Sequence, residues 1–276
     1  MNIVRDDSAG RRLKLSAVVK YRMTFRIRSL KKASGPFLYK YSSLDGPRLG
    51  WLRAILLDHQ IYFPSPEELN DKIDARPPLR VTSKERAFQR LLGPHLAGAP
   101  GDAATAYVEL RRLVDRADEN ALSHLITRSF HQEMEQHRIY SMSVRPDNEH
   151  LWTEYSGRHT GYCLEFANEG MPFGLAHEII YGEAPVLDFN DDADFEAAVL
   201  FCKTTEPWHR EEEVRVVLFP RNQPKHQRFD PTLLRRVILG RDVSATNEQT
   251  IRSWCEQRDP KLEVVIESVA AMTATT

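Results

Sequence analysis

The sequence predicts an α+β fold with a mixed or antiparallel sheet. Apolar residues in the first half recur mostly at helical spacing, and from Ile139 the period changes to two, as in a strand. Strands and helices do not alternate regularly, so a doubly wound parallel sheet is not expected. These observations predict one domain over residues 37–270, with a helical insertion near 82–137.

The composition is that of an ordinary soluble globular protein. The chain has 276 residues, a net charge of -1 and 41% hydrophobic residues. No apolar run approaches the roughly 20 residues of a membrane span, so no membrane partner is expected. Three scattered cysteines without CxxC spacing argue against disulfides or a zinc site. With no visible secretory signal, we expect a cytoplasmic protein that needs no metal.

The first elements follow a basic segment over residues 1–36. This arm is either a solvated, poorly ordered leader or a contact for phosphate backbones, and Met23 is an alternative start. Order is expected from Phe37. The sequence then predicts a strand at FLYKY, a helix over Leu49–Leu57 and a short strand at Ile61–Phe63.

Helices are predicted for most of residues 82–137. Thr82 or Ser83 can cap the first helix, and Gly93-Pro94 should end it. Asp102 can cap a longer helical region, with a break near Asp118–Asn120. The segment His131–His137 lacks the HExxH order and is interpreted as a polar helix face rather than a metal site.

The second half is predicted to supply most of the sheet. We expect strands at 138–144, 161–166, 178–181, 214–219, 236–239 and 263–266. Helices are expected at 151–156, 195–203 and 245–258, with Ser244 or Thr246 as the cap of the last one. A tail over 271–276 ends the chain.

Candidate catalytic residues lie in the stretch Lys203–Leu218, where three acids enter an apolar strand. Alternate residues of a strand point the same way, so Glu211, Glu213 and Arg215 share one face, and Glu212 shares the other with the following valines. One interpretation is a solvated strand end with one Glu paired to Arg215. The other is that Arg215 holds one carboxylate while another faces a cleft as an acceptor or base.

In the second interpretation, the two carboxylates have different roles. Glu213 begins the regular strand and is the principal residue, because a catalytic carboxylate needs fixed geometry. Glu211 lies in a turn that solvent reaches, and it assists. Arg215 is assigned a structural role.

Two further segments combine polar and aromatic residues. Lys40 and Tyr41 lie on a strand that either forms part of a nucleotide site or is an amphipathic edge strand. Ser141 and Ser143 share one strand face, and Trp152 and Tyr155 share one helix face. Core packing explains Trp152, but it explains the surrounding polar residues less well.

Together these segments resemble the bacterial family known as domain of unknown function 2971. The match runs in the family's order from about residue 37 to 240. Its pieces are Leu38–Tyr41, Ile61–Pro66, Leu69 with Asn70 and Asp71, Asp74, Ser143, Leu151–Trp152, Tyr155, His159, Gly161–Phe166, Lys203, Trp208, Glu211, Glu213, Arg215 and Val237–Gly240. The chain departs from the family pattern at Lys72, Ile73 and Val214, which concerns local packing.

The order of the motifs is also similar to that of ADP-ribosyltransferases and related NAD-cleaving folds. This resemblance implies an enzyme that uses NAD as a substrate and transfers ADP-ribose to a protein, a nucleic acid or water. It implies that Glu213 or Glu211 hydrogen-bonds the ribose and stabilises developing positive charge. It further implies a bacterial defence or toxin role.

The same resemblance assigns the remaining site residues. Tyr41 and Tyr155 would stack on the nicotinamide, and Lys40 would meet the pyrophosphate. Ser141 or Ser143 with Trp152 would complete the cofactor-binding set. Trp208, Asn70 and Asp71 would support the site structurally. We expect Lys40, Ser143, Trp152, Tyr155 and Glu213 to converge on one cleft.

The alternative function is a nucleotide- or nucleic-acid-binding effector module without catalysis. The basic arm would then contact phosphates together with Arg111-Arg112 and Arg235-Arg236. Binding of this kind weakens steeply as salt is added.

Overall fold

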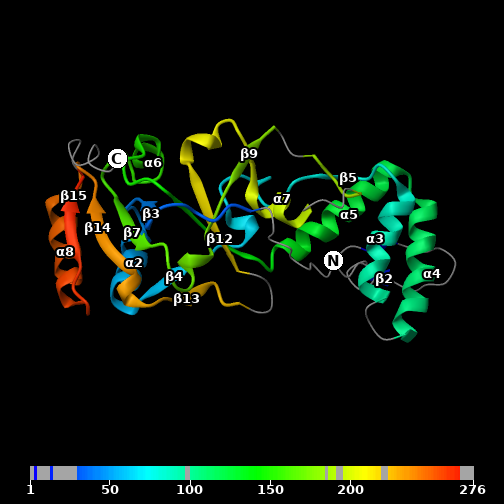
Figure 1. Ribbon diagram of the computed structural model, residues 1–276, viewed down its shortest axis with the longest axis horizontal. Helices are drawn as coiled ribbons and strands as arrows, with labels where there is room; N and C mark the ends of the chain where they lie inside the picture. The colour runs from blue at the N-terminus through cyan, green and yellow to red at the C-terminus, as the bar shows by residue number, and fades with distance from the viewer. Residues whose placement is uncertain are drawn as a thin grey trace. The chain divides into compact units, whose positions relative to one another are not determined.

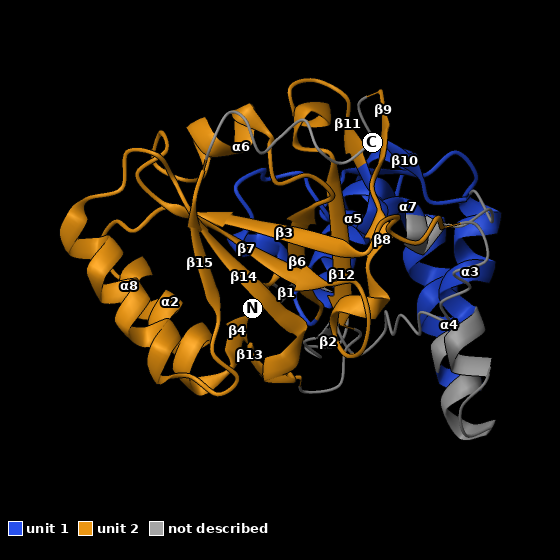
Figure 2. Ribbon diagram, turned by 60° about the vertical axis from the view of Figure 1, so that its left-hand side comes forward, with its two compact units in different colours: residues 1–29, 66–136, 184–202 blue, residues 30–65, 137–183, 203–276 orange. Residues whose placement is uncertain are grey.

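The structure is a computed structural model that describes residues 3–4, 13–14, 30–96, 100–183, 186–190, 195–218 and 223–267 (Figure 1). The chain divides into two compact units (Figure 2). Unit 1 comprises Met1–Ser29, Pro66–Gln136 and Ala184–Cys202, and unit 2 comprises Leu30–Ser65, His137–Glu183 and Lys203–Thr276. Whether the units form one domain with a helical insertion stays a prediction.

Unit 2 is built on a seven-stranded mixed sheet of order β15-β14-β7-β3-β6-β12-β8. Its strands are β3 (Phe37–Ser42), β6 (Arg138–Ser143), β7 (Tyr162–Ala167), β8 (His177–Glu178), β12 (Glu213–Leu218), β14 (Leu234–Leu239) and β15 (Glu263–Ile266). All neighbours are antiparallel except β14 and β15. The predicted α+β class with a mixed sheet is confirmed, and β3 is a central strand rather than an edge strand.

Helical layers cover both faces of this sheet. On one face, apolar residues such as Leu38, Val214 and Val237 pack against α2 (Arg48–Arg53), the π-helical turn η1 (Ala54–Asp58) and α8 (Ala245–Gln257). On the other face, α6 (Glu149–Glu154) packs Trp152 on Tyr41 and Cys163. Cys163 is a core residue, because it is fully buried.

Short elements complete unit 2. β4 (Gln60–Tyr62) pairs with β13 (His226–Arg228), and β9 (Ile180–Gly182) pairs with β11 (Cys202–Thr204). The 3-10 turns are η3 (Phe173–Leu175), η4 (Trp208–Glu211) and η5 (Pro231–Leu233). The predicted strand over 178–181 is interrupted at Ile179, whose N–H donates to the Glu213 carbonyl at 3.1 Å.

Unit 1 contains the predicted helical region. Its helices are α3 (Lys84–Leu96), α4 (Pro100–Arg116), α5 (Glu119–Met134) and α7 (Phe195–Phe201), with the turn η2 (Pro66–Glu68) and the pair β5 (Leu79–Arg80) and β10 (Leu187–Asp188). The expected break is confirmed: the Asp118 side chain caps α5 by accepting from the Ala121 N–H at 2.7 Å.

Three boundary predictions in unit 1 are wrong. α3 continues through Gly93-Pro94 to Leu96, because residues that favour a helix end do not enforce it. α4 begins at Pro100, ahead of the expected cap Asp102, since proline is favoured in a first turn. The helix predicted over 195–203 ends at Phe201, and Lys203 lies in β11.

The predicted N-terminal arm is only partly described. Ile3–Val4 (β1) pairs with Leu13–Lys14 (β2), and the rest of residues 1–29 lies outside the described residues, as does the tail over 271–276. Order begins before Phe37: Ala33 is buried, and its N–H donates to the Ala176 carbonyl at 2.9 Å. The described helices include none with the length and apolar character that crossing a membrane requires.

Candidate functional site

Two glutamates share one lysine at the start of β12. Lys203 Nζ lies 2.8 Å from Glu211 Oε2 and 3.1 Å from Glu213 Oε2. Arg215 Nε and one terminal nitrogen lie 2.9 and 2.8 Å from Glu213 Oε1. We call Lys203, Glu211, Glu213 and Arg215 the Lys203 cluster. Its charges balance, since it holds two cations and two carboxylates.

Local backbone geometry brings the two carboxylates together. η4 ends at Glu211, and Glu212 follows in the left-handed region with φ 45°. Glu212 turns outward and pairs with Arg145 at 3.2 Å, while its neighbours both reach Lys203. The predicted shared face is confirmed for Glu213 and Arg215 on β12, whereas Glu211 lies in η4 and reaches the same lysine through the left-handed turn at Glu212. The expected exposure of Glu211 to solvent is wrong, because the residue is only 5% exposed.

The Lys203 cluster is buried, and its electrostatics follow from that burial. Arg215 is 0% exposed and Glu213 4%. Burial by itself disfavours the carboxylate, but Arg215 and Lys203 outweigh this effect and lower the pKa of Glu213 to about 2. Glu213 is therefore ionised at neutral pH and held in one orientation by charge-assisted hydrogen bonds.

Three partly exposed aromatic residues surround the cluster. The Tyr155 hydroxyl donates to Glu211 Oε1, and the Tyr181 hydroxyl accepts from the Glu213 N–H at 2.9 Å. The Trp208 ring lies 4.4 Å from Lys203 Nζ in cation–π geometry. These rings are the parts of the site nearest to solvent, so an incoming ligand would meet them first.

Strand register places Ser143 beside the cluster. Cross-strand partners form a polar row over five neighbouring strands, and partners in an antiparallel ladder point to the same face. The row consists of Arg236, Glu165, Tyr39, Ser143 and Glu213. Ser141, which is two residues from Ser143 and opposite Arg215, hydrogen-bonds Glu213.

The Lys40 side chain projects from the face of the sheet opposite to this polar row, because Lys40 is next to Tyr39 on β3 and successive side chains of a strand point to opposite faces. Its Nζ donates to the Ser141 carbonyl at 2.8 Å and lies 4.9 Å from the centre of the Tyr140 ring. Burial lowers the pKa of Lys40, and the nearby carboxylates of Glu213 and Glu211 partly offset that effect. The Lys40 side chain is thus engaged with the protein's own main chain.

Tyr41 and Trp152 are core residues in this structure. They are 5% and 0% exposed, and their rings pack edge to face with centroids 5.1 Å apart. Trp152 Nε1 donates to the Pro146 carbonyl at 3.0 Å, and the Tyr41 hydroxyl donates to the Arg145 carbonyl at 2.7 Å. Tyr41 is therefore packed away from ligands, in contrast to the expected stacking role.

The structure brings together three of the five residues expected to converge. Ser143 and Glu213 are cross-strand partners, and Tyr155 joins them through Glu211. Of the other two, Lys40 lies on the opposite face of the sheet against Tyr140, and Trp152 lies in the hydrophobic core. Asn70 and Asp71 lie in unit 1, where their side chains accept main-chain N–H groups of the same turn at 3.0 Å.

The sequence interpretation missed two residues of the site. Lys203 belonged to the family resemblance, yet no role was assigned to it, although a lysine that directly follows the apolar run Val199–Cys202 indicates a buried cation that needs a carboxylate partner. Tyr181 gave no signal, because its hydroxyl reaches Glu213 only through folding.

Outside the Lys203 cluster, potential metal ligands meet at Glu149, His159 and Glu267.

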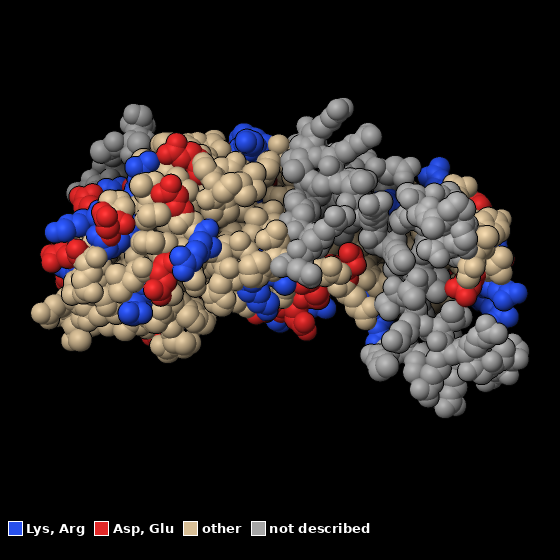
Figure 3. Space-filling view, turned by 90° about the horizontal axis from the view of Figure 1, so that it is seen from below, with Lys and Arg blue, Asp and Glu red and all other residues tan. Residues whose placement is uncertain are grey.

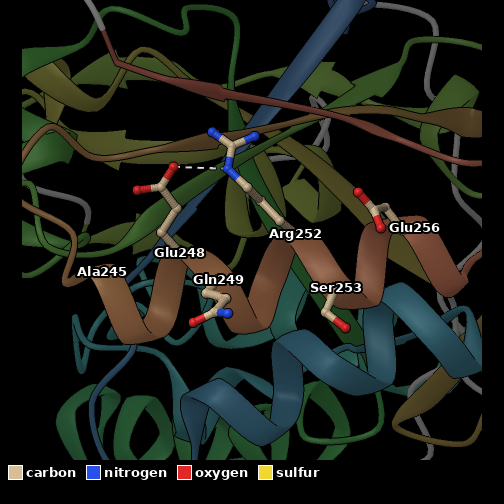
Figure 4. Close-up of a pocket in the computed structure, with 6 residues that line it drawn as sticks. All are labelled: Ala245, Glu248, Gln249, Arg252, Ser253 and Glu256. Atoms are coloured by element: carbon tan, nitrogen blue, oxygen red, sulfur yellow. Dashed lines mark hydrogen bonds and ion pairs between the residues drawn. The ribbon is translucent and has the colours of Figure 1, made fainter.

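Two grooves are lined by other described residues. One, of about 390 Å³, follows α8 and is lined by polar residues of that helix, including the Glu248–Arg252 pair (Figure 4). The other, of about 400 Å³, lies in unit 1 beside α5 and includes Arg76 and His131. Neither is lined by a member of the Lys203 cluster.

The arginines proposed for nucleic-acid contacts are largely engaged. Arg111 pairs with Glu85 and Asp115, and Arg235 and Arg236 pair with Glu169 and Glu165. On the face of unit 2 shown in Figure 3, acidic and basic side chains are interspersed rather than gathered by sign. These described residues therefore give the nucleic-acid alternative no specific support.

Comparison of the chain with protein-family models, curated proteins and solved structures finds no match.

Proposed function

We propose that the protein is a bacterial enzyme that cleaves the bond between nicotinamide and ribose in NAD, by ADP-ribosyl transfer or hydrolysis. The observation that carries the proposal is the pair of buried carboxylates, Glu211 and Glu213, fixed on Lys203 beneath an aromatic rim. Two fixed carboxylates suit a reaction whose transition state carries positive charge on a sugar ring.

The two carboxylates offer different bonding capacity. Glu213 is bound at both oxygens by cationic groups, and its low pKa keeps it ionised. Glu211 is bound by Lys203 and by the neutral hydroxyl of Tyr155. A ribose hydroxyl can take the place of the Tyr155 hydroxyl with little electrostatic change. We therefore assign substrate contact to Glu211 and electrostatic stabilisation to Glu213.

The reaction breaks the bond between ribose C1′ and the nicotinamide nitrogen. The bonding electron pair goes to nicotinamide, which leaves as a neutral molecule, and the positive charge develops on the ribose. The Glu211 carboxylate stabilises that charge, while Glu213 offsets the opposing charges of Lys203 and Arg215. The oxygen of water or of another acceptor then bonds to C1′, and its proton passes by way of Glu211 to solvent. In this proposal, Trp208 and Tyr155 stack on the leaving ring.

The proposal includes the family and the finer fold. Membership in domain of unknown function 2971 and an ADP-ribosyltransferase-like fold would explain why Glu213, which comes late in the sequence, lies at the end of the polar row across the sheet. Both rest on motif order, which is an analogy at the level of fold. A cytoplasmic location and a defence or toxin role belong to the same proposal.

The test is direct measurement of NAD consumption. The purified full chain is incubated with NAD, alone and with cell extract or nucleic acid, and free nicotinamide is quantified. Mass analysis then identifies any partner that gains ADP-ribose. Nicotinamide release supports the proposal, whereas its absence under every condition refutes the enzyme and leaves a binding module.

A further inference from the structure

A second cluster of ionisable side chains lies where β7 begins and where β14 and β15 end. The residues come from four segments: Glu149 begins α6, His159 precedes β7, Arg241 follows β14 and Glu267 follows β15. His159 Nδ1 lies 2.8 Å from Glu267 Oε2, and its Nε2 lies 3.0 Å from Glu149 Oε1. Both His159 and Glu267 are buried.

His159 is held in one position by its main chain and its ring. The residue has φ 65° and follows Arg158 at φ 54°, a conformation that is uncommon outside glycine. Its ring stacks on Trp152 with centroids 5.9 Å apart, and its carbonyl accepts from the Asp242 N–H at 3.0 Å. A Cβ on Gly240 would lie only 2.0 Å from that carbonyl oxygen. A backbone constrained in this way often serves a functional site.

The space between Glu149, His159 and Glu267 favours a cation, because two carboxylates face it. Ligand atoms of Glu149, His159 and Glu267 all lie within 4.8 Å of one another. The Arg241 guanidinium contacts all three, at 3.7, 2.9 and 3.4 Å respectively. One guanidinium offsets one of the two carboxylate charges, whereas a divalent cation at the same point would offset both.

We propose that Glu149, His159 and Glu267 bind a divalent transition-metal ion such as Zn²⁺, with Arg241 taking its place when no metal is bound. One imidazole nitrogen with carboxylate oxygens is a donor set that suits Zn²⁺, while Mg²⁺ and Ca²⁺ take oxygen ligands. His159 and Glu267 are preformed by burial. The side chains of Glu149 and Arg241 are 68% and 40% exposed, so Arg241 can move into solvent and water can complete the coordination.

The site is tested by metal titration of the full chain after treatment with a chelator. Calorimetry with Zn²⁺ should show one ion per chain, and Mg²⁺ should not bind at this site. Glu149→Gln removes an exposed ligand and should weaken Zn²⁺ binding by about 10–100-fold. Arg241→Gln removes the competing guanidinium and should tighten it. Glu248→Gln, which removes an α8 carboxylate paired with Arg252, should leave Zn²⁺ binding unchanged.

The readouts are independent of NAD cleavage, so failure here and failure of the proposed function are distinguishable. Co²⁺ provides a second measurement: its visible absorption on the wild-type chain should disappear in Glu149→Gln. Equal Zn²⁺ affinity in wild type and Glu149→Gln would overturn the proposal, and so would an Arg241→Gln variant that folds but binds Zn²⁺ no more tightly. The ion pairs of the cluster would then only stabilise the packing of α6 against the ends of β14 and β15.

Discussion

Replacing Arg215 by alanine should destabilise unit 2 strongly, because it leaves Glu213 charged and buried and removes one of the two cations, Arg215 and Lys203, that lower its pKa. Arg215 is fully buried, and two of its nitrogens contact one Glu213 oxygen at 2.8 and 2.9 Å. Removing one partner of a buried ion pair costs about 3–5 kcal/mol. For a chain of this size, that loss lowers the melting temperature by about 6–20 °C.

Urea unfolding and thermal melting of the purified chain measure this effect. Arg235→Ala is the matched control, because Arg235 pairs with Glu169 at the surface, with side chains 46% and 65% exposed. An exposed pair of this kind contributes about 0–1 kcal/mol. A double variant that adds Glu213→Gln should cost less than the two single changes combined, since no unpaired charge remains. If Arg215→Ala behaves like Arg235→Ala, the assigned structural role is refuted, and lost activity at normal stability would make Arg215 a substrate ligand.

Three further predictions concern neighbouring features. Because the pKa of Glu213 falls from an ordinary 4.5 to about 2 on folding, its stabilising effect is present above about pH 4.5 and is lost as the pH falls towards 2. In an acid titration, the unfolding free energy of wild type should therefore fall more steeply with decreasing pH than that of Glu213→Gln, and equal slopes would contradict the lowered pKa. Tyr155→Phe removes a hydrogen bond to the Glu211 carboxylate and should lower the unfolding free energy by about 1.5–3 kcal/mol, and an unchanged value in urea would contradict the contact. Gly240→Ala places a methyl group against the His159 carbonyl and should cost about 1–3 kcal/mol, whereas a neutral effect on melting would show that the two segments approach less closely.

The sequence predicted the elements of the sheet because period-two patterns and turn residues are local signals. FLYKY was correctly placed in the sheet, although its central position could not be predicted, since strand order depends on pairing between distant segments. The boundary errors at Pro94 and Asp102 arose because proline and capping residues favour a helix end without enforcing it.

The candidate site was predicted less completely than the fold. Alternation along β12 correctly put Glu213 and Arg215 on one face, away from Val214. Glu211 lies in η4, and the left-handed turn at Glu212, not strand alternation, brings its carboxylate to Lys203. The burial of Glu211 was not predictable, because it depends on Tyr155 and on the left-handed turn at Glu212. Tyr41 and Trp152 are buried by tertiary packing, which the sequence could not predict, because tyrosine and tryptophan occur both in ligand-stacking sites and in cores.

His159 belongs to the family resemblance, but its pairing with Glu267 could not be predicted from the sequence. His159 and Glu267 are 108 positions apart, and they meet only because β7 begins at the end of the sheet where β15 finishes. A contact of that kind depends on the completed topology, which local patterns do not encode.

The most direct test of the proposed chemistry compares three adjacent glutamine variants in one assay. Nicotinamide release from NAD is measured for Glu211→Gln, Glu212→Gln and Glu213→Gln beside the wild type, with each melting temperature recorded. Glu212 is the internal control, because it faces outward and pairs with Arg145. We predict near-wild-type release for Glu212→Gln and losses of at least about 100-fold for the other two, the scale for removing one electrostatic contact to a transition state. Equal release by all three folded variants would contradict a catalytic role for the Lys203 cluster.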